Sequence, residues 1–173
     1  MSKSNNVKNV IFLYPELTPY FIGCLNSFSY NFPKINLHIV YNNKFQNLIV
    51  NENAKYSLIK RSEFQNKEKL LEYCIELRPS IIIISGRMYS DYLYVAKKIK
   101  KVCTRVTVQD TLYRKSLKQL VLKNLSFYLY KRYFDKFWGV GSLQRKFALD
   151  IGFKEKDIYD GFYVADKISF ESS

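Results

Sequence analysis

Four consecutive isoleucines at residues 81–84 constrain the fold of this chain more than any other feature of its sequence. Isoleucine is β-branched and favours extended backbone, so the run predicts a strand. Successive side chains of a strand point to opposite faces of a sheet. An apolar run without alternation therefore indicates a strand that is buried on both faces, as in a parallel sheet covered by helices.

Along the whole chain, short apolar runs alternate with segments of helical periodicity. The apolar runs predict strands at residues 10–14, 37–41, 56–59, 81–84, 105–108, 137–140 and 158–164. Helices are predicted after residue 18, over residues 66–77, after residue 90, over residues 115–133 and over residues 142–152. Repeated βα units require crossover connections, so we expect an α/β fold. The expected architecture is one three-layer Rossmann-like domain over residues 1–173, with a mostly parallel sheet.

Single residues predict where several of these elements begin or end. Pro15 is expected to stop the first strand, and Thr18 with Pro19 is expected to cap and begin the helix that follows. Ser90 or Asp91 is predicted to cap the helix after the isoleucine run. Ser142 is predicted to cap the last helix.

The charge of the chain is strongly unbalanced. Lysine and arginine number 28 and aspartate and glutamate 15, which gives a net charge of +13. Twelve of the basic residues lie between residues 97 and 136, where only two acidic residues oppose them. Such a balance predicts an acidic partner: a phosphate compound, an anionic membrane surface or nucleic acid.

The predicted helix over residues 115–133 carries apolar and basic residues on one face, which is typical of a helix that contacts an anionic membrane. The residues of this predicted membrane-contact face are Lys115, Lys118, Leu122, Lys123, Leu129 and Lys131. The alternative is a helix buried between this domain and another. Nucleic-acid binding is less favoured, because no known nucleic-acid-binding motif occurs.

Several function classes lack the residues that they need. No glycine-rich dinucleotide motif follows the first predicted strand and no P-loop occurs, so hydride transfer and P-loop NTP hydrolysis are disfavoured. The one histidine, His38, is predicted to be a strand residue, and Cys24, Cys74 and Cys103 to be reduced thiols. We therefore expect no metal and no cofactor. No targeting segment or membrane span is evident, so we expect a cytoplasmic protein, peripheral to the inner face of the plasma membrane.

The candidate site residues follow the predicted strands, because ligands of parallel α/β sheets bind beyond the carboxyl ends of the strands. A carboxylate there can orient a sugar hydroxyl, and guanidinium groups suit phosphate. A helix cap for the aspartate and surface salt bridges for the arginines are the structural alternatives. The substrate-binding candidates are Glu16, Tyr20, Arg87, Gln109, Asp110 and Arg114. No catalytic residue is assigned.

Four segments, taken in order, resemble the N-terminal half of a family 4 (group 1) glycosyltransferase of the two-domain GT-B type. They are residues 10–20 (VIFLYPELTPY), residues 78–86 (RPSIIIISG), residues 106–110 (VTVQD), and residues 134–166, which include FDKFWGVG, ALDIGF and KDIYDGFYVAD. The resemblance implies transfer of a sugar from a nucleotide-sugar to an acceptor. Gln109 stands where the family has the histidine of an "HD" pair.

The resemblance also implies that this half holds the acceptor, while a C-terminal half grips the donor. That donor-binding half is absent from the sequence. We therefore expect a domain that binds the acceptor, a lipid-linked glycan used in surface polysaccharide biosynthesis. We expect this domain to be inactive until a donor-binding half or subunit completes the enzyme. The alternative is a non-enzymatic basic module that docks to an anionic membrane or, less favoured, to nucleic acid.

Overall fold

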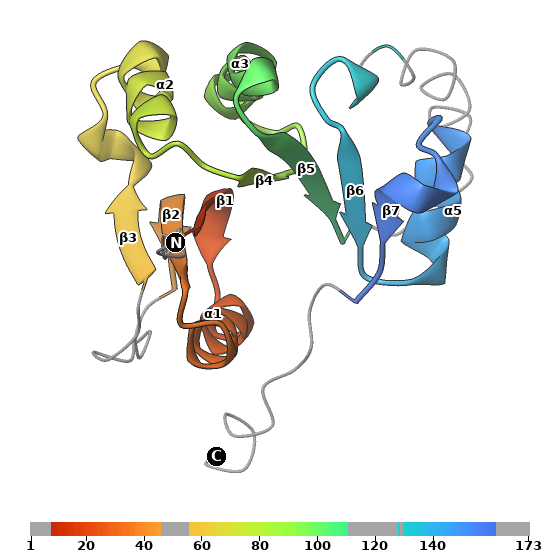
Figure 1. Ribbon diagram of the computed structural model, residues 1–173, viewed down its shortest axis with the longest axis horizontal. Helices are drawn as coiled ribbons and strands as arrows, with labels where there is room; N and C mark the ends of the chain where they lie inside the picture. The colour runs from red at the N-terminus through yellow and green to blue at the C-terminus, as the bar shows by residue number, and fades with distance from the viewer. Residues whose placement is uncertain (1–7, 46–55, 111–127, 129, 162–173) are drawn as a thin grey trace, which may run out of the picture.

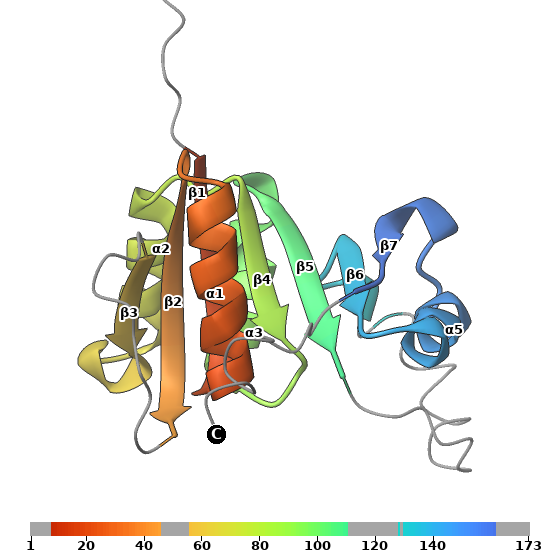
Figure 2. The same ribbon diagram turned by 90° about the horizontal axis from the view of Figure 1, so that it is seen from below.

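The computed structural model of the chain describes residues 8–45, 56–110, 128 and 130–161. These residues form a seven-stranded sheet in the order β3-β2-β1-β4-β5-β6-β7, in which every neighbouring pair is parallel. Figure 2 shows the strands side by side. We call the edge at which they all end the carboxyl edge. The strands are β1 (Lys8–Leu17), β2 (Ile35–Lys44), β3 (Tyr56–Lys60), β4 (Ile81–Ser85), β5 (Thr104–Gln109), β6 (Lys136–Gly139) and β7 (Ile158–Tyr159).

Helices cover both faces of this sheet. On one face lies α1 (Pro19–Asn31), and on the other lie α2 (Lys67–Glu76), α3 (Ser90–Lys98) and α5 (Ser142–Asp150). Figure 1 shows α1 on the side of the sheet opposite to α2 and α3. The predicted α/β fold class, a three-layer Rossmann-like domain, is therefore confirmed, and the described sheet is wholly parallel.

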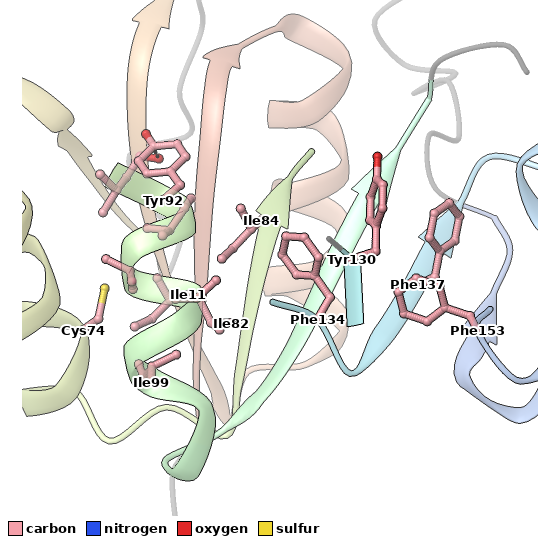
Figure 3. Packing of buried hydrophobic residues seen from close by; sticks show 14 of the residues in the cluster. Ile11, Cys74, Ile82, Ile84, Tyr92, Ile99, Tyr130, Phe134, Phe137 and Phe153 are labelled. Atoms are coloured by element: carbon pink, nitrogen blue, oxygen red, sulfur yellow. Dashed lines mark hydrogen bonds between the residues drawn. The ribbon is translucent and has the colours of Figure 1, made fainter. Parts of the chain in front are cut away.

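The isoleucine strand β4 occupies the middle of the sheet, between β1 and β5. Ile82 and Ile84 are fully buried and pack with residues of α2 and α3, as Figure 3 shows for part of this cluster. Ile83 is buried in the second cluster, which lies under α1. Burying one such side chain stabilises the fold by about 2 kcal/mol, so both layers depend on this strand.

Strand β1 does not stop at Pro15, as the sequence had indicated, but continues to Leu17. Its pairing with β4 ends at Leu13, whereas its pairing with β2 continues through Glu16 and Leu17. Beyond Leu13 the strand therefore has only one neighbour. Pro15 is tolerated there, because proline has no N–H to donate and an edge position does not require one on both sides.

The helix starts were predicted with mixed success. Thr18 caps α1 as expected, because its Oγ1 accepts from the Phe21 N–H at 3.3 Å. The cap of α3 is Tyr89, with no side-chain hydrogen bond, and the predicted caps Ser90 and Asp91 are instead the first two residues of the helix. The Asp91 carboxylate pairs with Arg61. Gly141, rather than Ser142, is the cap of α5.

Two other predictions reach beyond the described residues. Of the predicted helix over residues 115–133, the structure describes residues 128 and 130–133, so most of its membrane-contact face lies outside the described part. The last predicted strand, residues 158–164, is β7 over Ile158–Tyr159, and residues 162–164 lie outside the described part.

A buried arginine fastens the sheet to the layer that contains α3. The guanidinium of Arg105, in β5, is fully buried and donates to both carboxylate oxygens of Asp135, at 2.7 and 3.0 Å. It also donates to the carbonyl oxygens of Ala96 in α3, at 3.2 Å, and of Arg132, at 3.1 Å. Burial raises the pKa of Asp135, but the hydrogen bonds from Arg105 outweigh burial and hold that pKa below its ordinary value.

We predict that Asp135→Asn destabilises the protein by about 3 kcal/mol, because it leaves the charge of Arg105 buried without a counter-ion. Urea unfolding at neutral pH measures the change. Because the pKa of Asp135 is lower in the fold than its ordinary value of 3.8, its contribution is complete above that value and is lost as the pH falls through the folded pKa.

The control is Asp110→Asn, which neutralises an exposed carboxylate beyond β5 and should change stability by less than about 0.5 kcal/mol. Equal unfolding midpoints for the two variants would contradict a structural role for the Arg105–Asp135 pair.

His38, the one histidine, is a residue of β2 as predicted. Its Nδ1 lies 3.0 Å from Ser57 Oγ, and its Nε2 lies 3.5 Å from Asn9 Oδ1. The Asn9 amide nitrogen donates to the Leu77 carbonyl oxygen, so Oδ1 is the acceptor that faces Nε2–H, and it also accepts from the Asn36 amide at 3.2 Å. Nδ1 then accepts from the serine hydroxyl. This neutral imidazole links β1, β2 and β3, and burial lowers its pKa.

We predict that stability decreases as the pH falls below about 6.5, because the unfolded chain binds a proton that the folded imidazole resists. His38→Gln should flatten the dependence of the unfolding free energy between about pH 7.5 and about pH 5.5, where no other side-chain type has its ordinary pKa. Urea titrations of both proteins across this range measure the slopes. The same slope in the variant would assign the dependence to other groups.

Candidate functional site

The order of the strands reverses at β1, because β2 and β3 extend the sheet on one side and β4 to β7 on the other. In sheets of this kind, ligands bind beyond the strand ends near such a reversal. On the face that carries α3, the hydroxyl of Tyr92 occupies this place. It accepts from the Asn42 amide at 2.9 Å and donates to the Tyr14 carbonyl oxygen at 3.3 Å, and burial raises its pKa far above the usual range. Groups available to a ligand on this face must therefore come from the neighbouring strands β4 and β5.

Arg87 follows β4 directly after a turn at Gly86, whose φ of 62° suits glycine. The N–H of Gly86 donates to the Val108 carbonyl oxygen of β5 at 3.1 Å, which holds the turn against the end of that strand. The guanidinium carbon of Arg87 lies 5.2 Å from the centre of the Tyr130 ring. Its Nε is buried without a hydrogen-bond partner, and no described carboxylate pairs with this arginine. Arg87 is thus a half-buried cation, stacked on an aromatic ring, that has no counter-ion among the described residues.

Among the described residues, the other buried side-chain polar atoms without a partner are the Nε of Arg61, whose guanidinium pairs with Asp91, and two atoms of β5. The hydroxyl of Thr107 is fully buried, and the Oε1 of Gln109 is buried, yet neither makes a hydrogen bond. Both residues lie on the same face of β5 as Arg105, and Gln109 ends the strand. Buried polar atoms are paired in nearly all proteins, so these exceptions require an explanation. We call Arg87, Thr107, Gln109 and Tyr130 the Arg87 cluster.

Tyr130 is itself held in place by packing. Its ring contacts those of Phe134 and Phe147, with centroids 6.3 and 6.1 Å away. Figure 3 shows Tyr130 and Phe134 in the buried layer on this face of the sheet. The stacked guanidinium therefore rests on a rigid surface.

Asp110 follows Gln109, and its backbone is tied to α5. The Gln144 amide donates to the Asp110 carbonyl oxygen at 3.2 Å. Gln144 comes this close because Gly139 has no side chain: a Cβ at Gly139 would lie 2.8 Å from the Gln144 Cβ. The carboxylate of Asp110 remains exposed beyond the strand end.

The predicted site residues fall into two groups along the carboxyl edge. Arg87, Gln109 and Asp110 come together at the ends of the adjacent strands β4 and β5. Glu16 pairs with β2 at the end of β1, and Tyr20 lies half-exposed in the first turn of α1, on the opposite face from the Arg87 cluster. Arg114 lies outside the described residues.

Sequence reasoning missed Thr107 and Tyr130. Threonine is a common residue inside strands, and nothing in the sequence shows that the hydroxyl of Thr107 has no partner. Tyr130 precedes β6 by six residues and reaches Arg87 only through the tertiary fold. The one available signal was the position of Thr107 two residues before Gln109, which places both on one face of a strand.

Other kinds of site find little support in the described part of the chain. No group of three or more His, Cys, Asp or Glu side chains there could hold a metal ion. The thiols of Cys74 and Cys103 are unpaired, and burial raises their pKa values to about 12 and about 11, so they stay protonated at neutral pH. No described helix has the length and apolar character needed to cross a membrane.

Comparison with protein-family models and with curated proteins finds no match for this chain.

We predict that Thr107→Val stabilises the protein by about 1 kcal/mol, because it removes a buried hydroxyl that has no partner and keeps the shape of the side chain. Urea unfolding without added ligand measures the change. Thr104→Val in the same strand is the matched control, since Thr104 is partly exposed and its hydroxyl is not buried without a partner. A loss of stability in Thr107→Val would mean that the hydroxyl is partnered in the folded protein.

Proposed function

We propose that this chain is the acceptor-binding half of a GT-B glycosyltransferase, which transfers a sugar from a nucleotide-sugar to a lipid-linked glycan in surface polysaccharide biosynthesis. The observation that carries the proposal is that Arg87, which pairs with no described carboxylate, follows β4 where Gln109 and Asp110 end and follow the adjacent strand β5. Fold alone does not imply function, so the Rossmann-like sheet is only compatible with this role.

The side chains at this edge suit a sugar that carries a phosphate. A guanidinium binds phosphate oxygens through charge-assisted hydrogen bonds. The exposed Asp110 carboxylate accepts hydrogen bonds from sugar hydroxyls. In the proposed reaction these groups bind and orient the acceptor. They form no covalent intermediate.

A donor-binding half is required to complete the enzyme. The described residues form one sheet whose parallel strands all end along a single edge. We propose that a second half or a separate subunit supplies the groups that stabilise the leaving diphosphate. The chain by itself is then a binding protein.

A second candidate is a non-enzymatic module that docks to an anionic membrane. The observation that favours it is a group of exposed lysines at the end of α3 and in the following turn: Lys97, Lys98, Lys100 and Lys101. They lie at the edge of the sheet opposite the carboxyl edge, because α3 runs back from the end of β4 to the start of β5. Peripheral attachment through these lysines would leave the Arg87 cluster open, so the two candidates are compatible.

We predict that liposomes carrying a polyprenyl-diphosphate-linked monosaccharide bind the chain more tightly than otherwise identical liposomes carrying the polyprenyl diphosphate alone. Co-sedimentation measures the difference. Asp110→Asn should reduce the sugar-dependent part by about fivefold, because it removes a charged acceptor for hydroxyl groups. Glu76→Gln, on the exposed face of α2, should not change it.

Equal binding to both liposome types would reject the acceptor role. Sugar-independent binding that weakens with salt would support membrane docking instead. A variant with Lys118→Glu, Lys123→Glu and Lys131→Glu would then test whether the predicted helix over residues 115–133 takes part. Transfer from a nucleotide-sugar by the chain alone would contradict the need for a donor-binding half.

A further inference from the structure

We propose that the edge of the sheet opposite the carboxyl edge is a docking surface for an anionic lipid bilayer, held by a row of basic residues and by two exposed apolar side chains. We call it the basic edge. The inference deepens the second candidate function, membrane docking, on which it rests, and it does not depend on acceptor binding. The residues of the basic edge are Lys8, Phe32, Lys34, Arg78, Lys100, Lys101 and Val102.

The starts of four neighbouring strands form one continuous row at this edge. The Lys8 N–H donates to the Lys34 carbonyl oxygen at 3.4 Å, which joins the starts of β1 and β2. The Ser80 N–H donates to the Asn9 carbonyl oxygen at 2.9 Å, and the Thr104 N–H donates to that of Ser80 at 3.2 Å. These bonds align β2, β1, β4 and β5, whose starts Figure 2 shows at the top of the view. Because neighbouring strands lie about 4.8 Å apart, the row is about 14 Å long.

The charge in this row is entirely positive. The described segments at the four strand starts, residues 8–9, 32–34, 77–80 and 99–103, contain five basic residues and no acidic residue. No described carboxylate forms an ion pair with any of the five. The start of β6 differs, because Lys136 there pairs with Asp157 at 2.6 Å. Uncompensated positive charge therefore gathers at these four strand starts, where it attracts a densely anionic surface.

An exposed apolar side chain stands at each end of the row. Phe32, before β2, is 51% exposed and lies two residues before Lys34. Val102, before β5, is 45% exposed and follows Lys101 directly. Apolar side chains beside lysines are typical of surfaces that lie in the interface of an anionic bilayer, where the lysines meet the lipid phosphates and the apolar groups leave water. A nucleic acid offers base faces for stacking, from which a valine gains little, so the bilayer is the favoured occupant.

Docking through the basic edge sets the orientation of the domain. The strands run from this edge to the carboxyl edge, and the six residues of β5 span about 20 Å. The end of β5 and Arg87 would then face the aqueous side, away from the lipid.

Co-sedimentation of the full chain tests the surface with two kinds of liposome, phosphatidylcholine alone and an equimolar mixture of phosphatidylcholine and phosphatidylglycerol. We expect binding to the anionic liposomes to be at least about tenfold tighter and to weaken as salt is added. Lys34→Glu should weaken it by about fivefold or more, since it replaces a cation at the lipid surface with an anion. The matched control is Lys44→Glu, the same change in an exposed lysine at the other end of β2. It lies about 30 Å from Lys34, well beyond the screening length of about 10 Å, and should have little effect.

A second pair of variants tests the apolar contact. Val102→Ser should weaken binding to the anionic liposomes several-fold in low and in high salt, because salt does not screen an apolar contact. Met88→Ser changes a side chain that is 78% exposed at the carboxyl edge and should leave the binding unchanged. All four variants alter exposed side chains, so thermal melting should match that of the unaltered protein.

Three results would overturn the basic edge: equal binding to both kinds of liposome, equal effects of Lys34→Glu and Lys44→Glu, or equal effects of Val102→Ser and Met88→Ser. Tighter binding of a single-stranded RNA oligonucleotide than of the anionic liposomes, weakened by Lys34→Glu, would assign the edge to nucleic acid and would also overturn the proposal.

The outcome is separable from both candidate functions. These liposomes carry no sugar, so a failure here would leave the sugar-dependent binding through Asp110 as the test of the acceptor role. Anionic binding that Lys34→Glu leaves intact, but that Lys118→Glu, Lys123→Glu and Lys131→Glu together abolish, would reject the basic edge and keep the membrane-docking module.

Discussion

The burial of β4 on both faces is the constraint on which the rest of this structure depends. Ile82 and Ile84 lie in one core and Ile83 in the other, so each face of that strand needs its own layer of helices. A strand covered on both faces is joined to its neighbours by crossover helices, which makes the strands parallel. Parallel strands end at one edge. The positions of Arg87, Gln109 and Asp110 beside one another follow from this geometry.

Two arginines on the same face of the sheet, the buried Arg105 and the half-buried Arg87, have different surroundings. Arg105 forms a structural ion pair, because its guanidinium donates hydrogen bonds to Asp135 and to two backbone carbonyl oxygens. Arg87 has an aromatic ring beneath it and pairs with no carboxylate in the described part of the chain. Polar atoms that are buried without a described partner, such as the hydroxyl of Thr107, lower the stability of the fold.

The sequence predicted most elements of the described fold and part of the candidate site. The strand at residues 81–84 and the cap at Thr18 were confirmed, because local chemistry decides them. Pro15 was wrong as a strand end, since only the loss of a neighbour on one side lets proline stay in β1. Asp91 was wrong as a cap, because it is the second residue of α3, and its carboxylate pairs with Arg61, thirty residues earlier in the chain. Arg87 and Gln109 were predicted from their places after strands, but their shared lack of partners was not.

By itself, the sequence determined that this chain forms an α/β domain with a parallel sheet, and which residues follow the strands. Periodicity and β-branching express local preferences and burial, and these can be read without coordinates. Only the tertiary structure decided that Tyr130 lies under Arg87, that the hydroxyl of Thr107 has no partner and that Tyr92 fills the strand ends beside β1. Each of these depends on atoms distant in the chain, whose meeting is set by packing between layers and not by any pattern along the sequence.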